Sequence, residues 1–197
     1  MIIRDLNVGD AKIVARLHKR AFNNFFLTKL GHRFLVAFYI AIFQSKDSIN
    51  LGLFLDDELV GFAVGAKKSK SFYSNLLNRN FLKLGLSAFI PLLLNPSNIY
   101  RLFISLTSSN GADINIKEGA ILLSICVDPI NVAKGNGRLL LCRFEGIAFD
   151  FSDIISLTTD AVGNDSVNSF YISNGYKLHT SFYQGERKMN YYIKTKN

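Results

Sequence analysis

Apolar residues recur along the chain with two different periods, one typical of helices and one typical of strands. A spacing of three and four residues predicts one helix that Asp10 can cap, and a second over residues 28–43. Later helices are predicted over residues 138–149 and from Asn164 to a stop at Asn174-Gly175. Apolar runs bounded by turn residues predict strands at residues 2–6, 51–55, 59–66, 120–127, 154–158, 176–180 and 189–193.

The strands and helices interleave, which is typical of an α/β or α+β protein built around one central sheet. The clearest hairpin spans residues 51–66 and turns at Asp56-Asp57-Glu58. Between residues 69 and 119 the pattern changes to basic and aromatic residues followed by two or three helical segments. We interpret this stretch as an insertion, because about 50 residues form only a marginal domain. The prediction is therefore a single domain over residues 1–197 with a helical insertion.

Composition and charge narrow the classes of function. With 49% hydrophobic and 13% aromatic residues, the chain is not of the disordered class. The 23 Lys and Arg exceed the 15 Asp and Glu, and the net charge of +8 favours anionic ligands. No nucleic-acid-binding motif accompanies this charge, so we expect no nucleic-acid partner. The most apolar run, residues 81–94, is shorter than the ~20 residues that cross a bilayer, so we expect no stable membrane insertion.

The cysteines and histidines indicate neither a disulfide framework nor a metal site. Cys126 and Cys142 lie in apolar stretches, which predicts buried free thiols. No metal is expected, because the histidines and cysteines lack metal-ligand spacing. Charged residues near the N-terminus argue against a signal peptide. Together these features favour a soluble cytoplasmic protein.

The turn after the strand at residues 120–127 carries the first chemical signal. Gly135 and Gly137 lead into a helix whose first N–H groups have no partner within that helix. These groups and the helix dipole favour phosphate, and glycine leaves the approach to the backbone open. Lys134 and Arg138 add positive charge. A Walker-type loop is excluded because no Gly-Lys-Ser/Thr follows, and Leu140 at the third glycine position disfavours a dinucleotide fingerprint.

A second pattern follows some 25 residues later and reads Asn164-x-x-Val167-x-x-Phe170-Tyr171-x-x-Asn174-Gly175-Tyr176. Together with Val127-x-Pro129 and the two glycines, it resembles the Gcn5-related N-acetyltransferase (GNAT) superfamily. The motifs are specific over residues 120–178, and the order of elements agrees over the whole chain. Three positions depart from the family pattern: Val132 replaces Arg or Gln, Ala133 replaces glycine, and Val167 replaces alanine.

The resemblance implies a mixed, mostly antiparallel sheet with flanking helices and strands that splay at an acetyl-CoA site. In such a site Tyr171 would protonate the departing thiolate, and one backbone N–H would polarise the acetyl carbonyl. Asn164 would bind the amide arm of the cofactor. The residues implied to line the rest of the acetyl-CoA site are Ile125, Cys126, Val127, Val132, Ala133, Lys134, Gly135, Asn136, Gly137 and Arg138.

Several roles have an alternative. Tyr171 could be a core tyrosine, and Asn164 could be a helix N-cap. The sequence leaves the general base open. Its candidates are Glu118 first, then Asp128, Asp160 and His179, and a water chain or an amine that arrives neutral would need none of them.

The predicted reaction is direct attack by a primary amine on acetyl-CoA in a ternary complex. Residues 18–31 and 187–192 resemble members found among bacterial surface-polysaccharide enzymes, which favours a small anionic acceptor such as a nucleotide-linked amino sugar. The insertion at 69–119 would shape its pocket. The alternatives are a protein N-terminus or lysine as acceptor, or a non-catalytic module that binds acyl-CoA or a membrane surface. The sequence leaves a homodimer open.

Overall fold

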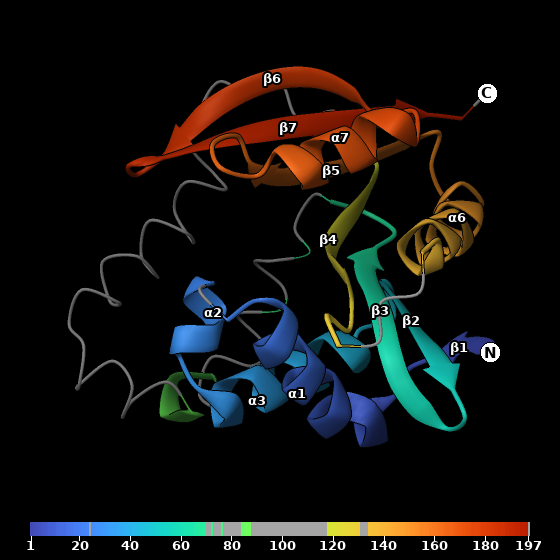
Figure 1. Ribbon diagram of the computed structural model, residues 1–197, viewed down its shortest axis with the longest axis vertical. Coiled ribbons are helices and arrows are strands. Elements are labelled where there is room, and N and C mark those ends of the chain that lie inside the picture. The colour runs from blue at the N-terminus through green and yellow to red at the C-terminus, as the bar shows by residue number, and fades with distance from the viewer. Residues whose placement is uncertain are drawn as a thin grey trace.

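A computed structural model describes residues 1–23, 25–69, 72, 76, 84–87, 118–130 and 134–196. Within these residues, strands form one sheet in the order β1-β2-β3-β4-β5-β7-β6 (Figure 1). The strands are β1 (Ile2–Asp5), β2 (Ser48–Leu55), β3 (Glu58–Ala66), β4 (Ala120–Val127), β5 (Ile154–Asp160), β6 (Lys177–Gln184) and β7 (Arg187–Thr195). All neighbouring strands are antiparallel except β4 and β5. The mixed, mostly antiparallel sheet is thereby confirmed.

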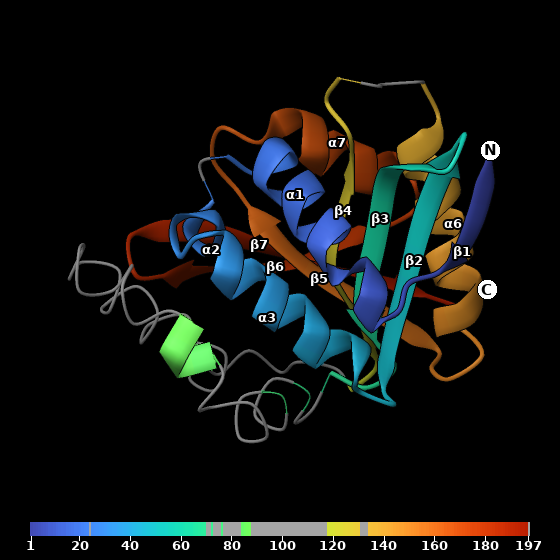
Figure 2. The same cartoon turned by 90° about the horizontal axis from the view of Figure 1, so that it is seen from below.

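Helices cover both faces of this sheet. They are η1 (Val8–Asp10), α1 (Ala11–Ala21), α2 (Phe26–Lys29), α3 (His32–Phe43), α6 (Asn136–Ala148) and α7 (Asp165–Ser173). Figure 2 shows α1 and α3 in front of β2 and β3, with α6 behind them. Each face therefore has its own hydrophobic core, one under α1 and α3 and one under α6 and α7.

The single helix predicted over residues 28–43 was wrong. The chain forms two helices, α2 and α3, because Gly31 between them has a φ of 90°. Glycine adopts this left-handed conformation without steric cost. The resulting bend buries Leu30 against Phe34 and Leu84.

Asp10 does not cap α1 through its side chain, contrary to the prediction. Its carboxylate instead accepts a hydrogen bond from the Asn7 N–H at 2.9 Å and pairs with Arg4 at 2.8 Å. The Asn7 side chain in turn accepts from the Gly9 N–H at 2.8 Å. The start of α1 is thus held by a capping box one turn earlier, around η1.

The predicted hairpin is confirmed as β2 and β3. Its turn consists of Asp56 and Asp57 alone, both with positive φ, and Glu58 already belongs to β3. Two-residue turns with positive φ match the twist of the flanking strands.

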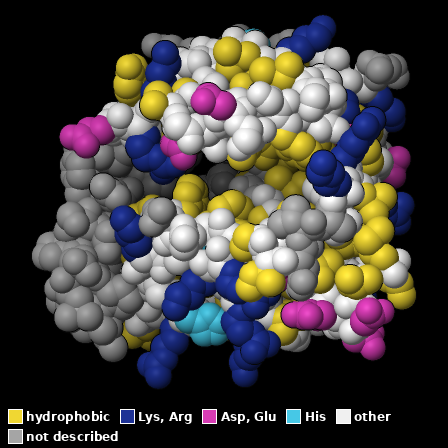
Figure 3. Space-filling view, in the orientation of Figure 1, with side chains coloured by type: hydrophobic (Ala, Val, Ile, Leu, Met, Phe, Trp, Pro, Cys, Tyr) yellow, Lys and Arg dark blue, Asp and Glu magenta, His cyan; other side chains and the backbone are white. Residues whose placement is uncertain are grey.

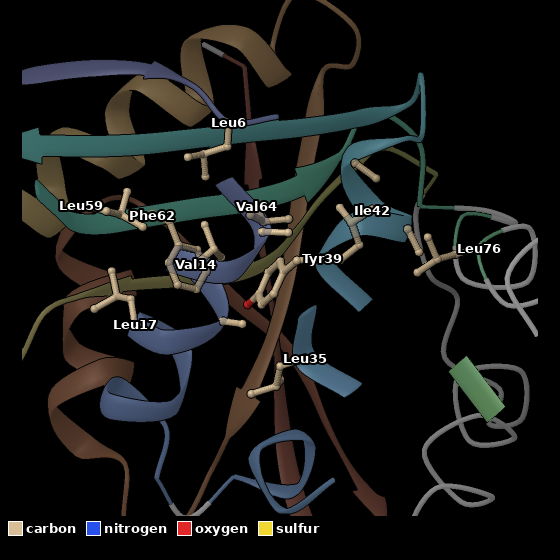
Figure 4. Close-up of a cluster of buried hydrophobic side chains, with 14 of the residues drawn as sticks. Leu6, Val14, Leu17, Leu35, Tyr39, Ile42, Leu59, Phe62, Val64 and Leu76 are labelled. Atoms are coloured by element: carbon tan, nitrogen blue, oxygen red, sulfur yellow. The ribbon is translucent and has the colours of Figure 1, made fainter. Parts of the chain in front are cut away.

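Figure 4 shows the core under α1 and α3, in which Tyr39 of α3 lies between α1 and the sheet. Phe72 and Leu76 of the predicted insertion also pack into this core. Most of residues 69–119 lies outside the described residues. No helix within the described parts of the chain has the length and apolar character needed to span a membrane.

Both cysteines are free, but the prediction that both are buried was wrong for Cys142, which is exposed on α6. Cys126 on β4 is partly buried, and burial raises the pKa of its thiol.

Candidate functional site

Strands β4 and β5 separate soon after they meet. Over their described lengths they pair at three positions, from Ala120↔Ile155 to Leu122↔Leu157. Beyond Leu122, β4 stays beside β3 up to Val127, and β5 stays beside β7. Figure 3 shows the surface hollowed to one side of β4, between α7 and α1, with hydrophobic side chains along the hollow. The parallel pair therefore opens into a groove through the middle of the sheet.

A bulge lies on β4 at the point where this groove begins. The register with β3 shifts between Val64 and Gly65, which are paired with Ser124 and Leu122. Leu123 packs against the core under α1 and α3, while Ile125 packs against the opposite core. A bulge inserts one extra residue and re-aims the side chains that follow it. Leu123 and Ser124 therefore both face α1 and α3.

The backbone of β4 presents two donors to the groove. The Asp128 N–H donates to the Val60 carbonyl of β3 at 2.7 Å. Because bonding direction alternates along an antiparallel strand, the N–H groups of Ile125 and Val127 face away from β3. Such donors can stabilise charge that develops on a carbonyl oxygen.

The first turn of α6 lies just beyond the end of β4. Gly135 occupies the N-cap with a φ of 99° and has no side chain to cap the helix. The first bond of the helix runs from the Leu139 N–H to the Gly135 carbonyl, so the N–H groups of Asn136, Gly137 and Arg138 lack acceptors within α6. The turn contains no acidic residue.

Space around the two glycines of this turn is open on the protein side. Among the described residues, a Cβ added at Gly135 would meet nothing within 4 Å, and one at Gly137 would meet only the Phe170 ring at 3.8 Å. Lys134 and Arg138 are exposed beside them. Of the other residues assigned to this turn, Val132 and Ala133 lie outside the described residues, and Asn136 is buried. The described part of the turn fits a phosphate group.

Asn164 stands at the N-cap position of α7, but its side chain does not cap the helix. Its Nδ2 donates to Thr159 Oγ1 at 2.7 Å, which fastens the start of α7 to β5. The neighbouring Asn168, which the motif analysis did not single out, is buried and donates to the Asp160 carbonyl at 3.0 Å. Its Oδ1 accepts from the Tyr192 hydroxyl at 2.8 Å. The four-residue spacing from Asn164 places Asn168 on the same side of α7, a signal that the sequence contained.

Tyr171 lies in the core under α6 and α7, together with Ile125 and Val127. Its ring centroid is 5.7 Å from that of Tyr176 and 6.1 Å from that of Tyr192. Burial raises the pKa of Tyr171 well above its ordinary value. The phenol therefore holds its proton at neutral pH, and its role as an acid stays a prediction.

The candidates for the general base occupy very different surroundings. Asp128 is 1% exposed, pairs with Arg20 and accepts a hydrogen bond from the Ile130 N–H. Asp160 pairs with Arg187 through both carboxylate oxygens, at 2.7 and 2.8 Å. Both aspartates therefore form ion pairs with arginines of other helices or strands.

The other two candidates lie away from the bulge. Glu118 precedes β4 at the end where β4 and β5 are paired, and it lies five positions before Leu123. At about 3.3 Å per extended residue this spans at most roughly 16 Å. His179 is exposed on β6, with its ring 5.8 Å from that of Tyr191.

A buried polar pair that the sequence analysis missed lies in the core under α1 and α3. His18 on α1 is 2% exposed, and its Nδ1 is 2.7 Å from the Tyr39 hydroxyl. Burial lowers the pKa of His18 to about 4. Its Nε2 is also buried and has no hydrogen-bond partner among the described residues. The sequence signal was a histidine four residues after Val14, within the apolar stripe of α1.

Comparison with known proteins identifies the architecture. The sequence matches no protein-family model and no curated protein. A PaiA N-acetyltransferase from Thermoplasma acidophilum, solved in complex with coenzyme A, is similar in structure, with a TM-score of 0.57 and 16% identity over 96% of each chain. An acetyltransferase from Thermus thermophilus has a TM-score of 0.60 and 13% identity over 98% of this chain and 96% of that chain. This is the GNAT acetyltransferase fold.

A ribosomal-protein-alanine N-acetyltransferase from Brucella melitensis shares it, with a TM-score of 0.59 and 13% identity over 99% of both chains. The match over nearly the full length of these GNAT-fold proteins confirms the fold expected from the motifs. At such low identity it establishes the fold alone, and the function must be argued from the groove and the turn of α6.

Proposed function

We propose that this protein transfers the acetyl group of acetyl-CoA to a primary amine. The observation that carries the proposal is that two features adjoin strand β4. The β4–β5 groove opens along β4, and the first turn of α6 follows the end of β4. A long thioester substrate with a phosphate-bearing end fits both features at once. The motif resemblance to GNAT enzymes and the coenzyme A complex of a structural neighbour support this reading.

The residues of the groove suit an acyl-CoA. The N–H groups of the first turn of α6 would bind the pyrophosphate, with Lys134 and Arg138 adding charge. Cys126 lies on β4 between Ile125 and Val127 and would line the pantetheine arm, while Asn164 would hold the start of α7 beside it. The Cys126 side chain packs against the core under α1 and α3, and burial raises the pKa of its thiol, so we assign it no role as a nucleophile.

The chemistry is an acyl transfer without an acyl-enzyme. The amine nitrogen forms a bond to the acetyl carbon, the carbon–sulfur bond breaks, and the amine loses one proton while the thiolate gains one. The N–H groups of Ile125 or Val127 would stabilise the carbonyl oxygen as it gains charge. Tyr171, kept protonated by burial, would supply the proton to the sulfur.

A small anionic amine such as a nucleotide-linked amino sugar is the acceptor that the charge favours. Lys19, Lys29 and Arg33 are exposed on α1, α2 and α3, and Figure 3 shows a basic cluster over these helices, below the groove. A protein amine is the second candidate, favoured by the structural likeness to a ribosomal-protein-alanine N-acetyltransferase.

The test combines calorimetry of coenzyme A binding with thiol release from acetyl-CoA. The amines are glucosamine, a nucleotide-linked amino sugar, a peptide with an N-terminal alanine and a peptide with an internal lysine. Turnover with the nucleotide-linked sugar alone supports the small anionic acceptor, and turnover with either peptide overturns it in favour of a protein amine. Binding without turnover on any amine would support a non-catalytic acyl-CoA-binding module. Absence of coenzyme A binding would refute the whole proposal.

A further inference from the structure

The positive charge of the chain is concentrated in its first helices. Of the 23 Lys and Arg, seven lie in residues 11–46, which include α1, α2 and α3 and contain no Asp or Glu. The other 16 Lys and Arg are almost balanced by the 15 Asp and Glu. Nearly all of the net charge of +8 therefore belongs to this one region. Positive charge confined to one region favours an anionic partner at that region.

Helix α1 presents a row of cations on its outer side. Lys12, Arg16 and Lys19 follow one another at spacings of four and three residues, which places them on one side of the helix. All three are exposed, whereas Val14 and Leu17 on the other side are buried. At 1.5 Å per residue the row is about 10 Å long.

Two more cations follow on the next helices. Lys29 ends α2 and Arg33 lies in the first turn of α3, and both are exposed. The Thr28 hydroxyl donates to the Phe22 carbonyl at 2.6 Å, which holds α2 against the end of α1. We call these five cations the basic surface: Lys12, Arg16, Lys19, Lys29 and Arg33. None of the five forms an ion pair with a described residue, and Figure 3 shows basic side chains gathered over these helices.

The basic surface is larger than one small acceptor can contact. Arg20 near the end of α1 pairs with Asp128 just beyond β4, so this end of α1 is the one beside the groove. Lys12 belongs to the first turn of α1, at the opposite end of the helix. A small amine in the groove would therefore reach one end of the basic surface at most. An extended anionic partner could contact all of it.

Apolar side chains are interspersed among these cations. The exposed or half-buried apolar residues from α1 to α2 include Ile13, Phe22, Phe25, Phe26 and Leu27. Phe25 is the most exposed of them, at 38%. Proteins that bind nucleic-acid phosphates commonly add Ser, Thr, Asn or Gln contacts to those of Lys and Arg. A combination of basic with aromatic and aliphatic side chains is instead typical of helices that lie on a membrane surface.

We propose that the basic surface docks this protein on a membrane surface rich in anionic phospholipids. The five cations lie among the lipid phosphates, and Phe25 enters the boundary between headgroups and acyl chains. The contact is peripheral, since no helix in the described parts of the chain could span a bilayer. The turn of α6 stays accessible in this orientation, because α6 covers the face of the sheet opposite to α1 and α3.

The test is co-sedimentation with vesicles of phosphatidylcholine alone and of phosphatidylcholine and phosphatidylglycerol in equal parts. The wild-type chain should sediment with the anionic vesicles and not with the neutral ones, and salt should weaken this binding because it screens exposed charges. Each basic residue at an anionic membrane surface strengthens binding about fivefold. The triple variant Lys12→Gln, Arg16→Gln and Lys19→Gln should therefore bind the anionic vesicles about 100-fold more weakly.

A matched triple variant separates the basic surface from net charge. Arg143→Gln, Lys177→Gln and Lys188→Gln remove the same charge from exposed positions on α6, β6 and β7, and this variant should bind within about threefold of wild type. Thermal denaturation checks that both variants are folded. Vesicle binding that survives the α1 substitutions, or that both triple variants lose equally, would show that the basic surface is not the docking site.

Two further outcomes would overturn the membrane assignment. One is a wild-type chain that binds the neutral vesicles as well as the anionic ones, or binds neither. The other is binding to an RNA oligonucleotide of mixed sequence without binding to vesicles, which would assign the basic surface to nucleic acid. The assay contains neither acetyl-CoA nor an amine, so its result does not depend on the proposed function.

Discussion

A valine at Gly137 tests whether the turn of α6 binds the phosphates of acetyl-CoA. Within the described parts of the chain, the added Cβ would meet only the Phe170 ring at 3.8 Å, which is an ordinary contact and leaves room for the valine. Valine also has a somewhat higher helix propensity than glycine, by a few tenths of a kcal/mol. The free energy of unfolding should therefore stay within about 1 kcal/mol of wild type. The side chain would instead fill the open space in front of the turn.

The expected loss is in ligand affinity. A hydrogen bond from a backbone N–H to a charged group contributes about 1.5–3 kcal/mol. Keeping the phosphate away from the Gly137 N–H should therefore cost about 2 kcal/mol, which corresponds to a roughly 30-fold higher Kd, since 1.4 kcal/mol is a tenfold change.

Isothermal titration with coenzyme A and thermal denaturation measure the two effects separately. Gly146→Val is the matched control, because Gly146 belongs to the same helix and is exposed, and no described residue lies within 4 Å of an added Cβ. We expect the control to bind coenzyme A like wild type. A folded Gly137→Val variant with an unchanged Kd for coenzyme A would show that the phosphates do not bind at this turn.

Three further predictions concern buried groups. Tyr171→Phe should lower kcat about 10²–10⁴-fold with little change in KM, whereas a kcat within threefold of wild type would show that Tyr171 is a core residue without a catalytic role. Because burial raises the pKa of this phenol, the wild-type rate should show no loss from its ionisation up to about pH 10. Arg20→Leu should lower the free energy of unfolding by about 2 kcal/mol in urea titrations, because it leaves the buried Asp128 carboxylate without its cation, and an equal loss in the exposed Arg16→Leu would contradict this reason. The pKa of His18 in the folded protein lies below its value of about 6.5 in the unfolded chain, so the free energy of unfolding that it contributes is present above pH 6.5 and falls by about 3 kcal/mol toward pH 4. His18→Phe should lack this part of the pH dependence. Identical plots of unfolding free energy against pH for the two proteins would refute this prediction.

The elements could be predicted because their signals are local. The apolar stripe of α1, the hairpin of β2 and β3 and the Asn174-Gly175 stop of α7 all depend on side chains within a few residues of one another. At the end of α7 the Gly175 N–H donates to the Ile172 carbonyl at 3.0 Å and Gly175 has a φ of 87°, as a glycine stop requires. The errors were local as well, since the helical spacing continued across Gly31 and hid the bend there.

The candidate site could be predicted only in part. Short motifs predicted the glycines of the α6 turn and Tyr171. In the structure the glycines begin α6 just beyond the end of β4, and Tyr171 packs against Ile125 and Val127 of β4. The partners of the charged candidates could not be read from the chain. Asp128 looked like a free carboxylate until the fold brought Arg20 to it across 108 residues of sequence.

By itself the sequence determined the helices, the strands and the glycine turn, because periodicity and turn chemistry act over a few residues. Tertiary structure decided where β4 leaves β5, on which face Ser124 lies, and that His18 meets Tyr39. The physical reason is register, since a one-residue bulge on β4 exchanges the face of every side chain that follows it, and the position of that bulge depends on pairing with β3 rather than on the residues of β4 alone.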